Sequence, residues 1–211
     1  MDSVNVTPGS AAHWDGAYRH GDTSRSWFQR QPGASLRLLD EIGLRTSDSL
    51  IDVGGGASTL VDALLERGHL DLTVLDISAE GMATAQQRLG ANASQVRWLD
   101  ADLLTWTPDR TWHVWHDRAV LHFFTTDADR QRYLHALDRA TKPGSLAVLA
   151  AFAPDGPQHC SGLSVARYNV EDLTALLGPT WELLTDAHEE HTTPTGATQP
   201  FTWSAFRRQP P

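Results

Sequence analysis

Three consecutive glycines and two nearby acids are the residues whose types and spacing best indicate chemistry in this sequence. Gly54, Gly55 and Gly56 follow the apolar segment 50–53. Because glycine has no Cβ, a glycine turn lets the backbone bend sharply and approach a ligand closely. Ser58 is then expected to cap a helix. A strand, a glycine turn and a helix in this order are how open α/β folds bind nucleotide-like ligands.

The two acids, Asp52 and Asp76, indicate which ligand the turn receives. Asp52 lies just before the first glycine, where a carboxylate favours a cationic ammonium group over an anionic pyrophosphate. Asp76 ends the next apolar segment, where an acid can accept hydrogen bonds from ribose hydroxyls. A ligand with a ribose, a cationic amino acid and no phosphate is S-adenosylmethionine (SAM).

Two other interpretations of this region stay open at this point. A glycine cluster after a strand is often a tight turn that binds nothing. A dinucleotide such as NAD is the second possibility, but its G-x-G-x-x-G pattern requires a third glycine where this chain has Thr59. The pattern therefore favours SAM over NAD.

The elements that must position these residues follow from the apolar pattern. We expect strands at 50–53, 72–75, 96–99, 112–116, 145–152, 181–184 and 201–206, and helices at 34–43, 58–67, 79–89, 127–141 and from 169 onward. The repeated order of strand and helix predicts a doubly wound α/β fold, with a mostly parallel sheet and helices on both faces. The final pair of strands is expected to close the sheet with an antiparallel strand.

The segment after the fourth expected strand is the next candidate for chemistry. The carboxyl end of that strand lies beside the glycine loop, where the strand order reverses. His116, Asp117 and His122 are therefore candidates for the region where a methyl group is transferred. His122 is the first candidate for a general base, since imidazole titrates near neutrality, and a packed histidine is the alternative. Arg118 is expected to pair with a carboxylate or to cap strand ends.

Length and charge limit the class of protein. The 211 residues, 40% of them hydrophobic, can bury the core of one domain. The 17 basic and 26 acidic residues give a net charge of −9, which makes nucleic acid an unfavourable partner. Cys160 is the single cysteine, so the chain has no internal disulfide. The sequence shows no secretion signal and no apolar run of membrane-spanning length, and a cytoplasmic protein is expected.

Several polar segments have less regular patterns. Residues 1–12 are expected to form a flexible arm before a single domain at 13–211. Within that domain, the aromatic segment 13–33 is expected either to cover the edge of the sheet or to form a lid over the ligand. The loop 153–168 could form part of a substrate pocket. His188 and His191 are expected to be solvated hairpin residues, and no metal site is expected.

Five motifs together resemble one group of bacterial class I SAM-dependent methyltransferases. They are S-W-F-Q at 26–29, D-V-G-G-G-A-S at 52–58, D-I-S at 76–78, the acidic segment 100–102 and W-H-D-R-A-V-L-H-F at 115–123, and the likeness extends to C-S-G-L with R-Y in the segment 160–168. The likeness extends over nearly the whole chain from His13 onward. The H-D-R and C-S-G segments are more particular than the glycine loop, which is common to a large superfamily.

The resemblance implies a seven-stranded sheet of order 3-2-1-4-5-7-6, and SAM as the cofactor. It places Asp52 and Gly54 at the methionine end of SAM, Asp76 on the ribose, and Ile77 and Asp102 at the adenine. The full set of predicted cofactor contacts is Asp52, Gly54, Gly55, Gly56, Ser58, Asp76, Ile77, Ala101, Asp102, Asp117 and Trp27. The predicted substrate contacts are Phe28, His122, Phe123, Cys160, Arg167 and Tyr168.

The resulting expectation is an enzyme that transfers the SAM methyl group by in-line displacement to a nitrogen, oxygen or sulfur atom of a small molecule. The protein would contribute mainly by orienting acceptor, methyl and sulfur. The candidate catalytic residues are His122, His116 and Asp117. Two alternatives remain, namely a methyltransferase that acts on lysines of proteins and a SAM-binding protein without catalysis.

Overall fold

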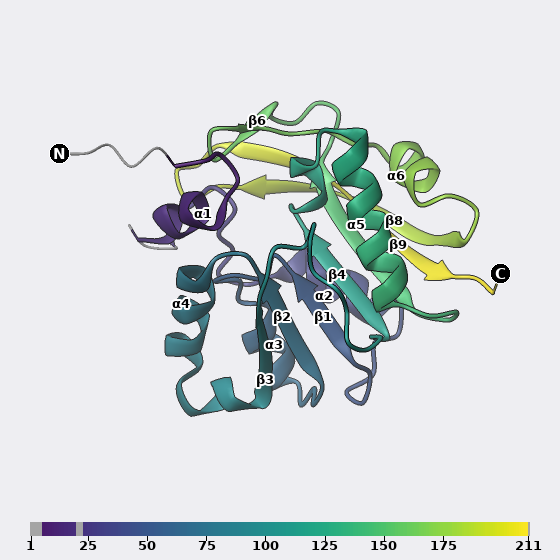
Figure 1. The fold of residues 1–211 in the computed structure, drawn as a ribbon, viewed down its shortest axis with the longest axis horizontal. Coiled ribbons are helices and arrows are strands. Elements are labelled where there is room, and N and C mark those ends of the chain that lie inside the picture. The colour runs from purple at the N-terminus through teal and green to yellow at the C-terminus, as the bar shows by residue number, and fades with distance from the viewer. Residues whose placement is uncertain (1–5, 20–22, 211) are drawn as a thin grey trace.

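A seven-stranded sheet runs through the centre of the molecule (Figure 1). The structure, a computed structural model, describes residues 6–19 and 23–210. The first five strands are parallel, and the last strand along the chain, β9, is antiparallel to both of its neighbours. The predicted doubly wound sheet is therefore confirmed, with β8 and β9 as its sixth and seventh strands. In spatial order the strands are β3 (Val96–Asp100), β2 (Leu72–Asp76), β1 (Leu50–Val53), β4 (Val114–Arg118), β5 (Leu146–Phe152), β9 (Thr198–Arg208) and β8 (Trp181–Thr192).

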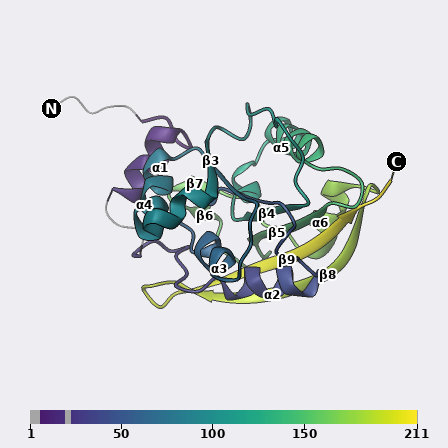
Figure 2. The same ribbon diagram turned by 90° about the horizontal axis from the view of Figure 1, so that it is seen from below.

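Helices cover both faces of this sheet. Figure 2 shows α2 and α3 below it and α5 on the opposite side. A short hairpin of β6 (His159–Cys160) and β7 (Leu163–Ser164) lies outside the main sheet. The helices are α1 (Ala11–Tyr18), α2 (Gly33–Glu41), α3 (Leu60–Glu66), α4 (Ala79–Leu89), α5 (Asp127–Ala140) and α6 (Val170–Leu177), with 3₁₀ helices η1 (Gly90–Gln95) and η2 (Leu121–Phe123).

The central strands place alternate side chains in two separate cores, because successive residues of a strand point to opposite faces. Leu50 of β1 and Val148 of β5 pack in the core that includes α2 and α3. Their neighbours Ile51 and Leu149 pack in the core that includes α5 and α6. Burial on both faces explains why these strands appear in the sequence as continuous apolar segments.

Polar side chains fix where several helices begin. Ser78 Oγ accepts the N–H of Gly81 at the start of α4. At α6, Asn169 and Asp172 bond to each other's backbone N–H in a capping box. The predicted cap at Ser58 is wrong, because α3 begins only at Leu60 and Ser58 Oγ accepts the Leu60 N–H in the preceding turn.

The fourth strand is displaced along the chain from its predicted position. It spans Val114–Arg118 rather than 112–116. Trp112 precedes the strand, where its indole N–H donates to Thr73 Oγ1 at 3.0 Å. The displacement brings Asp117 into the same strand as His116. Because the two residues are neighbours in a strand, their side chains point to opposite faces of the sheet.

The last two strands are longer than predicted, since the sequence indicated strands only at 181–184 and 201–206. Much of β8 alternates between exposed and half-buried residues, and its polar residues concealed the strand pattern. The expectation of two solvated histidines holds for His188, which is exposed, and fails for His191. The side chain of His191 is buried, with Nε2 lying 2.7 Å from the carbonyl oxygen of Ser26.

The amino-terminal segment differs from the predicted arm. Residues 1–5 of that arm, and residues 20–22 of the predicted lid, lie outside the described residues. α1 begins at Ala11, because Ser10 supplies an N-cap that accepts the N–H of His13. The predicted loop at 153–168 contains the β6–β7 hairpin.

Candidate active site

The glycine loop lies between two side chains that leave no room for a Cβ. Gly54 has a φ of +67°, and a Cβ there would lie 2.0 Å from Cγ2 of Val120. Gly56 has a φ of +40°, and its Cβ would lie 2.6 Å from the hydroxyl oxygen of Tyr18. The N–H of Gly54 donates to the carbonyl of Leu75 at 2.7 Å, which holds the loop at the end of β2. Glycine is therefore required at both positions by conformation and by space.

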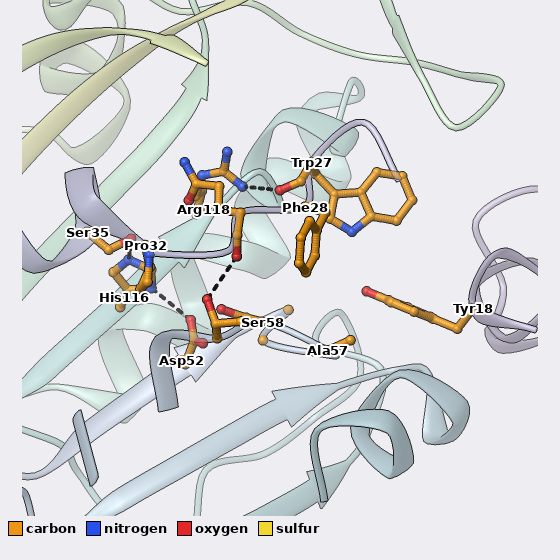
Figure 3. A pocket seen from close by; sticks show the side chains of 14 residues that line it. Tyr18, Trp27, Phe28, Pro32, Ser35, Asp52, Ala57, Ser58, His116 and Arg118 are labelled. Atoms are coloured by element: carbon orange, nitrogen blue, oxygen red, sulfur yellow. Dashed lines mark hydrogen bonds and ion pairs between the residues drawn. The ribbon is translucent and has the colours of Figure 1, made fainter. Parts of the chain in front are cut away.

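Two adjoining cavities lie beside this loop. The smaller cavity is bordered by Ser35, Asp52 and His116, with aromatic side chains opposite them (Figure 3). The larger cavity has a volume of about 460 Å³ and extends from Asp76 to the β6–β7 hairpin. The residues that border both cavities are Tyr18, Trp27, Gly54 and Arg118.

A chain of three polar side chains forms one wall of the smaller cavity. Asp52 and His116 are register partners on β1 and β4, so their side chains point to the same face. His116 Nδ1 lies 2.7 Å from Asp52 Oδ1, and His116 Nε2 lies 3.0 Å from Ser35 Oγ. Among the described residues, the buried Oδ2 of Asp52 has no hydrogen-bond partner. One carboxylate oxygen is thus fixed, and the other remains available to a ligand.

Asp76 is the buried acid of the larger cavity. The N–H of Ser78 donates to its Oδ1 at 2.7 Å. Burial nevertheless raises the pKa of Asp76 to about 7, because removal from water disfavours the charged form more than the backbone donors favour it. Asp102 lies across the cavity with an exposed carboxylate, and Asp102 Oδ1 accepts the N–H of Leu104.

Aromatic residues of the amino-terminal segment border both cavities. The Trp14 ring lies 4.9 Å from that of Phe123 and 6.2 Å from that of Trp27, measured between centroids. α1 is held in place by Asp15, whose carboxylate accepts the hydroxyl of Ser78 at 2.7 Å. Of the two expectations for this segment, a position over the ligand cavities agrees better with this geometry than an edge cover does.

Most of the predicted cofactor residues border a cavity. Gly56 borders neither, but it lies directly under the Tyr18 hydroxyl. Asp117 also borders neither. The predicted cofactor residues that line at least one cavity are Trp27, Asp52, Gly54, Gly55, Ser58, Asp76, Ile77, Ala101 and Asp102.

Asp117 has a structural environment that the sequence did not indicate. Its side chain lies on the face of the sheet opposite to His116, and both of its oxygens accept hydrogen bonds. These come from the N–H of Val120 at 2.9 Å, the N–H of Leu121 at 3.1 Å and the hydroxyl of Tyr133 at 2.8 Å. Burial raises the pKa of Asp117 to about 6. A carboxyl group so occupied supports the turn after β4 and does not face a ligand.

The geometry also argues against His122 as a general base. It is fully buried and borders neither cavity, and its ring packs against those of Phe123 and Phe152. Burial, together with the charge of Arg118, lowers the pKa of His122 to about 3. A buried ring with a lowered pKa agrees better with the alternative of a packed histidine than with an imidazole that titrates near neutrality.

The predicted substrate residues separate into two groups. Phe28 lines the smaller cavity, while Phe123 and Cys160 line the larger one. Arg167 lies on the surface, where it donates to the carbonyl of Pro154 at 2.6 Å. Tyr168 is buried in the core under α5 and α6. Neither of these two residues borders a cavity.

Arg118 and Ser35 are site residues whose positions sequence reasoning missed. Arg118 was expected to pair with a carboxylate or to cap strand ends, and its Nη1 donates to the carbonyl of Trp27 at 3.0 Å. Ser35 had no motif to mark it, since it belongs to an ordinary amphipathic helix. The only sequence signal for Arg118 was its place immediately after His116 and Asp117 at the end of a buried strand.

The described part of the chain, residues 6–19 and 23–210, contains neither a cluster of metal ligands nor a membrane-spanning helix. No group of three or more histidine, cysteine, aspartate or glutamate side chains there could hold a metal ion. No helix in the same ranges is long and apolar enough to cross a membrane.

Sequence comparison identifies residues 50–144 as a match to the methyltransferase domain family. This segment runs from β1 to the turn before β5 and includes the glycine loop, Asp76 and His116. No curated protein sequence is similar enough to the chain to count as a match.

Solved structures show the same fold over nearly the whole chain. A SAM-dependent methyltransferase from Anabaena variabilis is 14% identical, with a TM-score of 0.74, and the match covers 94% of this chain and 93% of that one. The 1,6-didemethyltoxoflavin-N1-methyltransferase of Burkholderia thailandensis is 19% identical, with a TM-score of 0.68 and coverage of 94% and 84%. A protein studied for the conversion of a disulfide bond into a thioacetal group during echinomycin biosynthesis is 19% identical, with a TM-score of 0.72 and coverage of 94% and 93%. The chain therefore has the fold of the SAM-dependent methyltransferases, with the methyltransferase domain match at its centre.

Proposed function

We propose that the protein is a SAM-dependent methyltransferase that acts on a nitrogen, oxygen or sulfur atom of a small molecule. The observation that carries this proposal is the placement of two buried acids around one glycine loop. Asp52, with its free Oδ2, borders one cavity, and Asp76 borders the next. Gly54 lies between them and borders both. The acids fit a ligand that has an ammonium group at one end and a ribose further along.

Each part of SAM has a candidate partner in this arrangement. Asp52 Oδ2 would accept the ammonium group, while His116 and Ser35 hold the other oxygen of the carboxylate in place. Asp76 would accept the ribose hydroxyls. Ile77 and Asp102 would border the adenine in the larger cavity. His116 then acts as a positioning residue, since both of its ring nitrogens already have partners.

SAM supplies an activated methyl group, because its sulfonium is a good leaving group. The protein's contribution is to hold the acceptor in line with the methyl–sulfur bond and to exclude water. The rings of Trp14, Trp27 and Phe123 suit this role, since they form an apolar wall of the larger cavity. Aromatic faces also attract a cationic sulfonium.

The walls of the larger cavity support a small-molecule acceptor. Aromatic residues from α1, the 23–33 segment and η2 border it on one side, and the β6–β7 hairpin supplies Cys160 and Leu163. The solved relative from Burkholderia thailandensis, which was crystallised with 1,6-didemethyltoxoflavin, acts on a small heteroaromatic compound. A protein acceptor would instead need an open groove for an extended lysine side chain and its flanking peptide.

Calorimetric titration with S-adenosylhomocysteine (SAH), the product form of the cofactor, tests the proposal. We expect micromolar binding of SAH and none of NAD. Asp76→Ala should weaken SAH binding at least tenfold. Asp100→Ala is the matched control, since Asp100 is the register partner of Asp76 on β3 and borders neither cavity. A folded protein that does not bind SAH would refute the cofactor assignment, and a screen of acceptors with radiolabelled SAM would follow a positive result.

A further inference from the structure

We propose that Arg118 binds a carboxylate group of a ligand at the junction of the two cavities. The proposal rests on the proposed function, because it assigns one end of the cofactor or one group of the acceptor to this residue. It goes further by naming a chemical group that the ligand must carry.

The position of Arg118 brings a cation to the centre of the site. It is the last residue of β4 and borders both cavities. Its guanidinium lies over the Phe201 ring, 4.8 Å from the centroid, and donates from Nη1 to the carbonyl of Trp27 (Figure 3). These two contacts fix the plane of the guanidinium.

The remaining donors of Arg118 are buried without a partner. Within residues 6–19 and 23–210, neither Nε nor Nη2 has a hydrogen-bond acceptor. Two carboxylates, Glu189 and Asp52, favour its charged form. Both oxygens of Glu189 are engaged elsewhere, since they accept from Gln29 and from Trp203, each at 2.8 Å. Asp52 is engaged through Oδ1, which lies 2.7 Å from His116 Nδ1. Arg118 therefore has no ion pair within 4 Å in the described part of the chain.

A buried cation in this state is unfavourable unless something pairs with it. Burial lowers the pKa of Arg118, which reflects the same cost. The hydrogen bond to the Trp27 carbonyl does not by itself explain why a cation lies here, because a neutral donor could form the same bond. Two nitrogen atoms of the guanidinium, Nε and Nη2, have no acceptor among the described residues, and a carboxylate is the group whose geometry matches such a fork best.

Two ligands could supply the carboxylate. The first is the cofactor, since the smaller cavity is bordered by both Asp52 and Arg118. An α-amino acid there would present its ammonium group to Asp52 Oδ2 and its carboxylate to Arg118. The second is an aromatic acceptor that carries a carboxylate, held in the larger cavity against Phe123 and Phe124.

Calorimetry with three adenosine compounds tests the first source. The probes are SAH, decarboxylated SAH, which keeps the ammonium group, and methylthioadenosine, which lacks the amino acid. We expect Arg118→Met to weaken SAH binding about 10- to 100-fold, and to change binding of the other two probes by less than about threefold. Arg110→Met is the matched control, because Arg110 also lies over an aromatic ring, that of Trp112, but pairs with Asp71 on the surface.

Fluorine NMR tests the second source in the presence of SAH. The probes are 4-fluorobenzoate and the uncharged 4-fluorobenzamide. If the acceptor supplies the carboxylate, Arg118→Met should abolish benzoate binding and leave benzamide binding and SAH affinity unchanged. Arg118→Lys, which keeps the charge but loses the fork, should restore part of the lost binding in either arm.

The outcomes separate this proposal from the proposed function. Loss of binding confined to the carboxylate-bearing probe supports it and identifies the source. Equal loss of all probes by Arg118→Met, or unchanged binding of SAH and of benzoate, overturns it. If the wild-type protein binds no adenosine compound, the proposed function fails, and the benzoate arm still decides the role of Arg118. Thermal melting confirms that each variant is folded.

Discussion

Asp52 and Asp117 are buried acids at the same end of the sheet, on neighbouring strands, but they face opposite sides. Asp52 is the register partner of His116, and Val53 is the register partner of Asp117. Asp52 keeps one oxygen without a partner beside the smaller cavity, whereas Asp117 accepts three hydrogen bonds from its own turn and from α5. The face of the sheet, and not the distance from the glycine loop, therefore separates the acid that we propose binds the ligand from the supporting one.

The largest effect should come from removing the supporting acid. Asp117→Ala leaves the Tyr133 hydroxyl and the N–H groups of Val120 and Leu121 without their acceptor in a buried region. We expect the free energy of unfolding to fall by about 3 to 4 kcal/mol. Urea denaturation followed by circular dichroism measures this. Tyr133→Phe, which removes one of the three donors and also the acceptor of the Trp115 indole N–H, should cost less, about 2 kcal/mol. A stable Asp117→Ala variant that has lost SAH binding would reverse the assignment.

Asp52 should show the opposite behaviour. Asp52→Asn keeps a side-chain partner for His116 but removes the negative charge that faces the cavity. We expect SAH affinity to fall about 100-fold while the free energy of unfolding changes by less than about 1 kcal/mol. Calorimetry measures the affinity, and methylthioadenosine serves as the control because it has no ammonium group. Equal weakening of both compounds would show that the variant disturbs the whole site.

Sequence reasoning succeeded where one residue type or one pattern was enough. Apolar segments buried on both faces indicated the central strands, and the family resemblance supplied their order. The glycine loop required glycine for reasons of conformation and space at Gly54 and Gly56. The sequence could not show which face each residue of β4 occupies, because a shift of the strand by an odd number of residues moves every side chain to the opposite face. It also could not show that Ser35, from a separate helix, completes the chain of His116 and Asp52. The sequence pattern did not reveal the full length of β8, because many of its residues are polar and exposed.

The pH dependence of binding should be smaller than the effect of Asp52→Asn and should arise from Asp76. Its pKa of about 7 in the folded protein lies above the ordinary value of 3.8, because of burial. Ribose hydroxyls donate to the ionised form, so SAH affinity should rise about tenfold between pH 6 and pH 8 and level off above that. Calorimetry across this range measures the effect. Asp76→Asn should bind more weakly and show a flat profile, and a wild-type affinity that falls with pH would contradict this.

The same shift predicts the direction of a stability change in the ligand-free protein. The folded protein holds a proton on Asp76 that the unfolded chain releases above pH 4, since its folded pKa is the higher one. The stabilising contribution of this group is therefore complete below about pH 4, and it is lost as the pH rises through about 7. Asp117 adds a change of the same sign that ends near pH 6. Unfolding of Asp76→Asn should thus depend less on pH between 4 and 7 than unfolding of the wild type.

His122 should give the smallest effect on ligand binding, although it belongs to the motif at 115–123 that follows the glycine loop in the resemblance. Within the described residues, neither of its ring nitrogens has a hydrogen-bond partner, and its pKa of about 3 keeps the ring neutral. Replacing an unpaired buried polar group with an apolar one of similar volume is neutral or stabilising. We therefore expect His122→Leu to keep SAH affinity within about twofold and to raise the free energy of unfolding by up to about 1 kcal/mol. Turnover on an identified acceptor is the decisive measurement. A loss of more than about 100-fold in kcat with unchanged SAH affinity would restore His122 as the base, and it would require a rearrangement that brings the imidazole into the larger cavity when ligands bind.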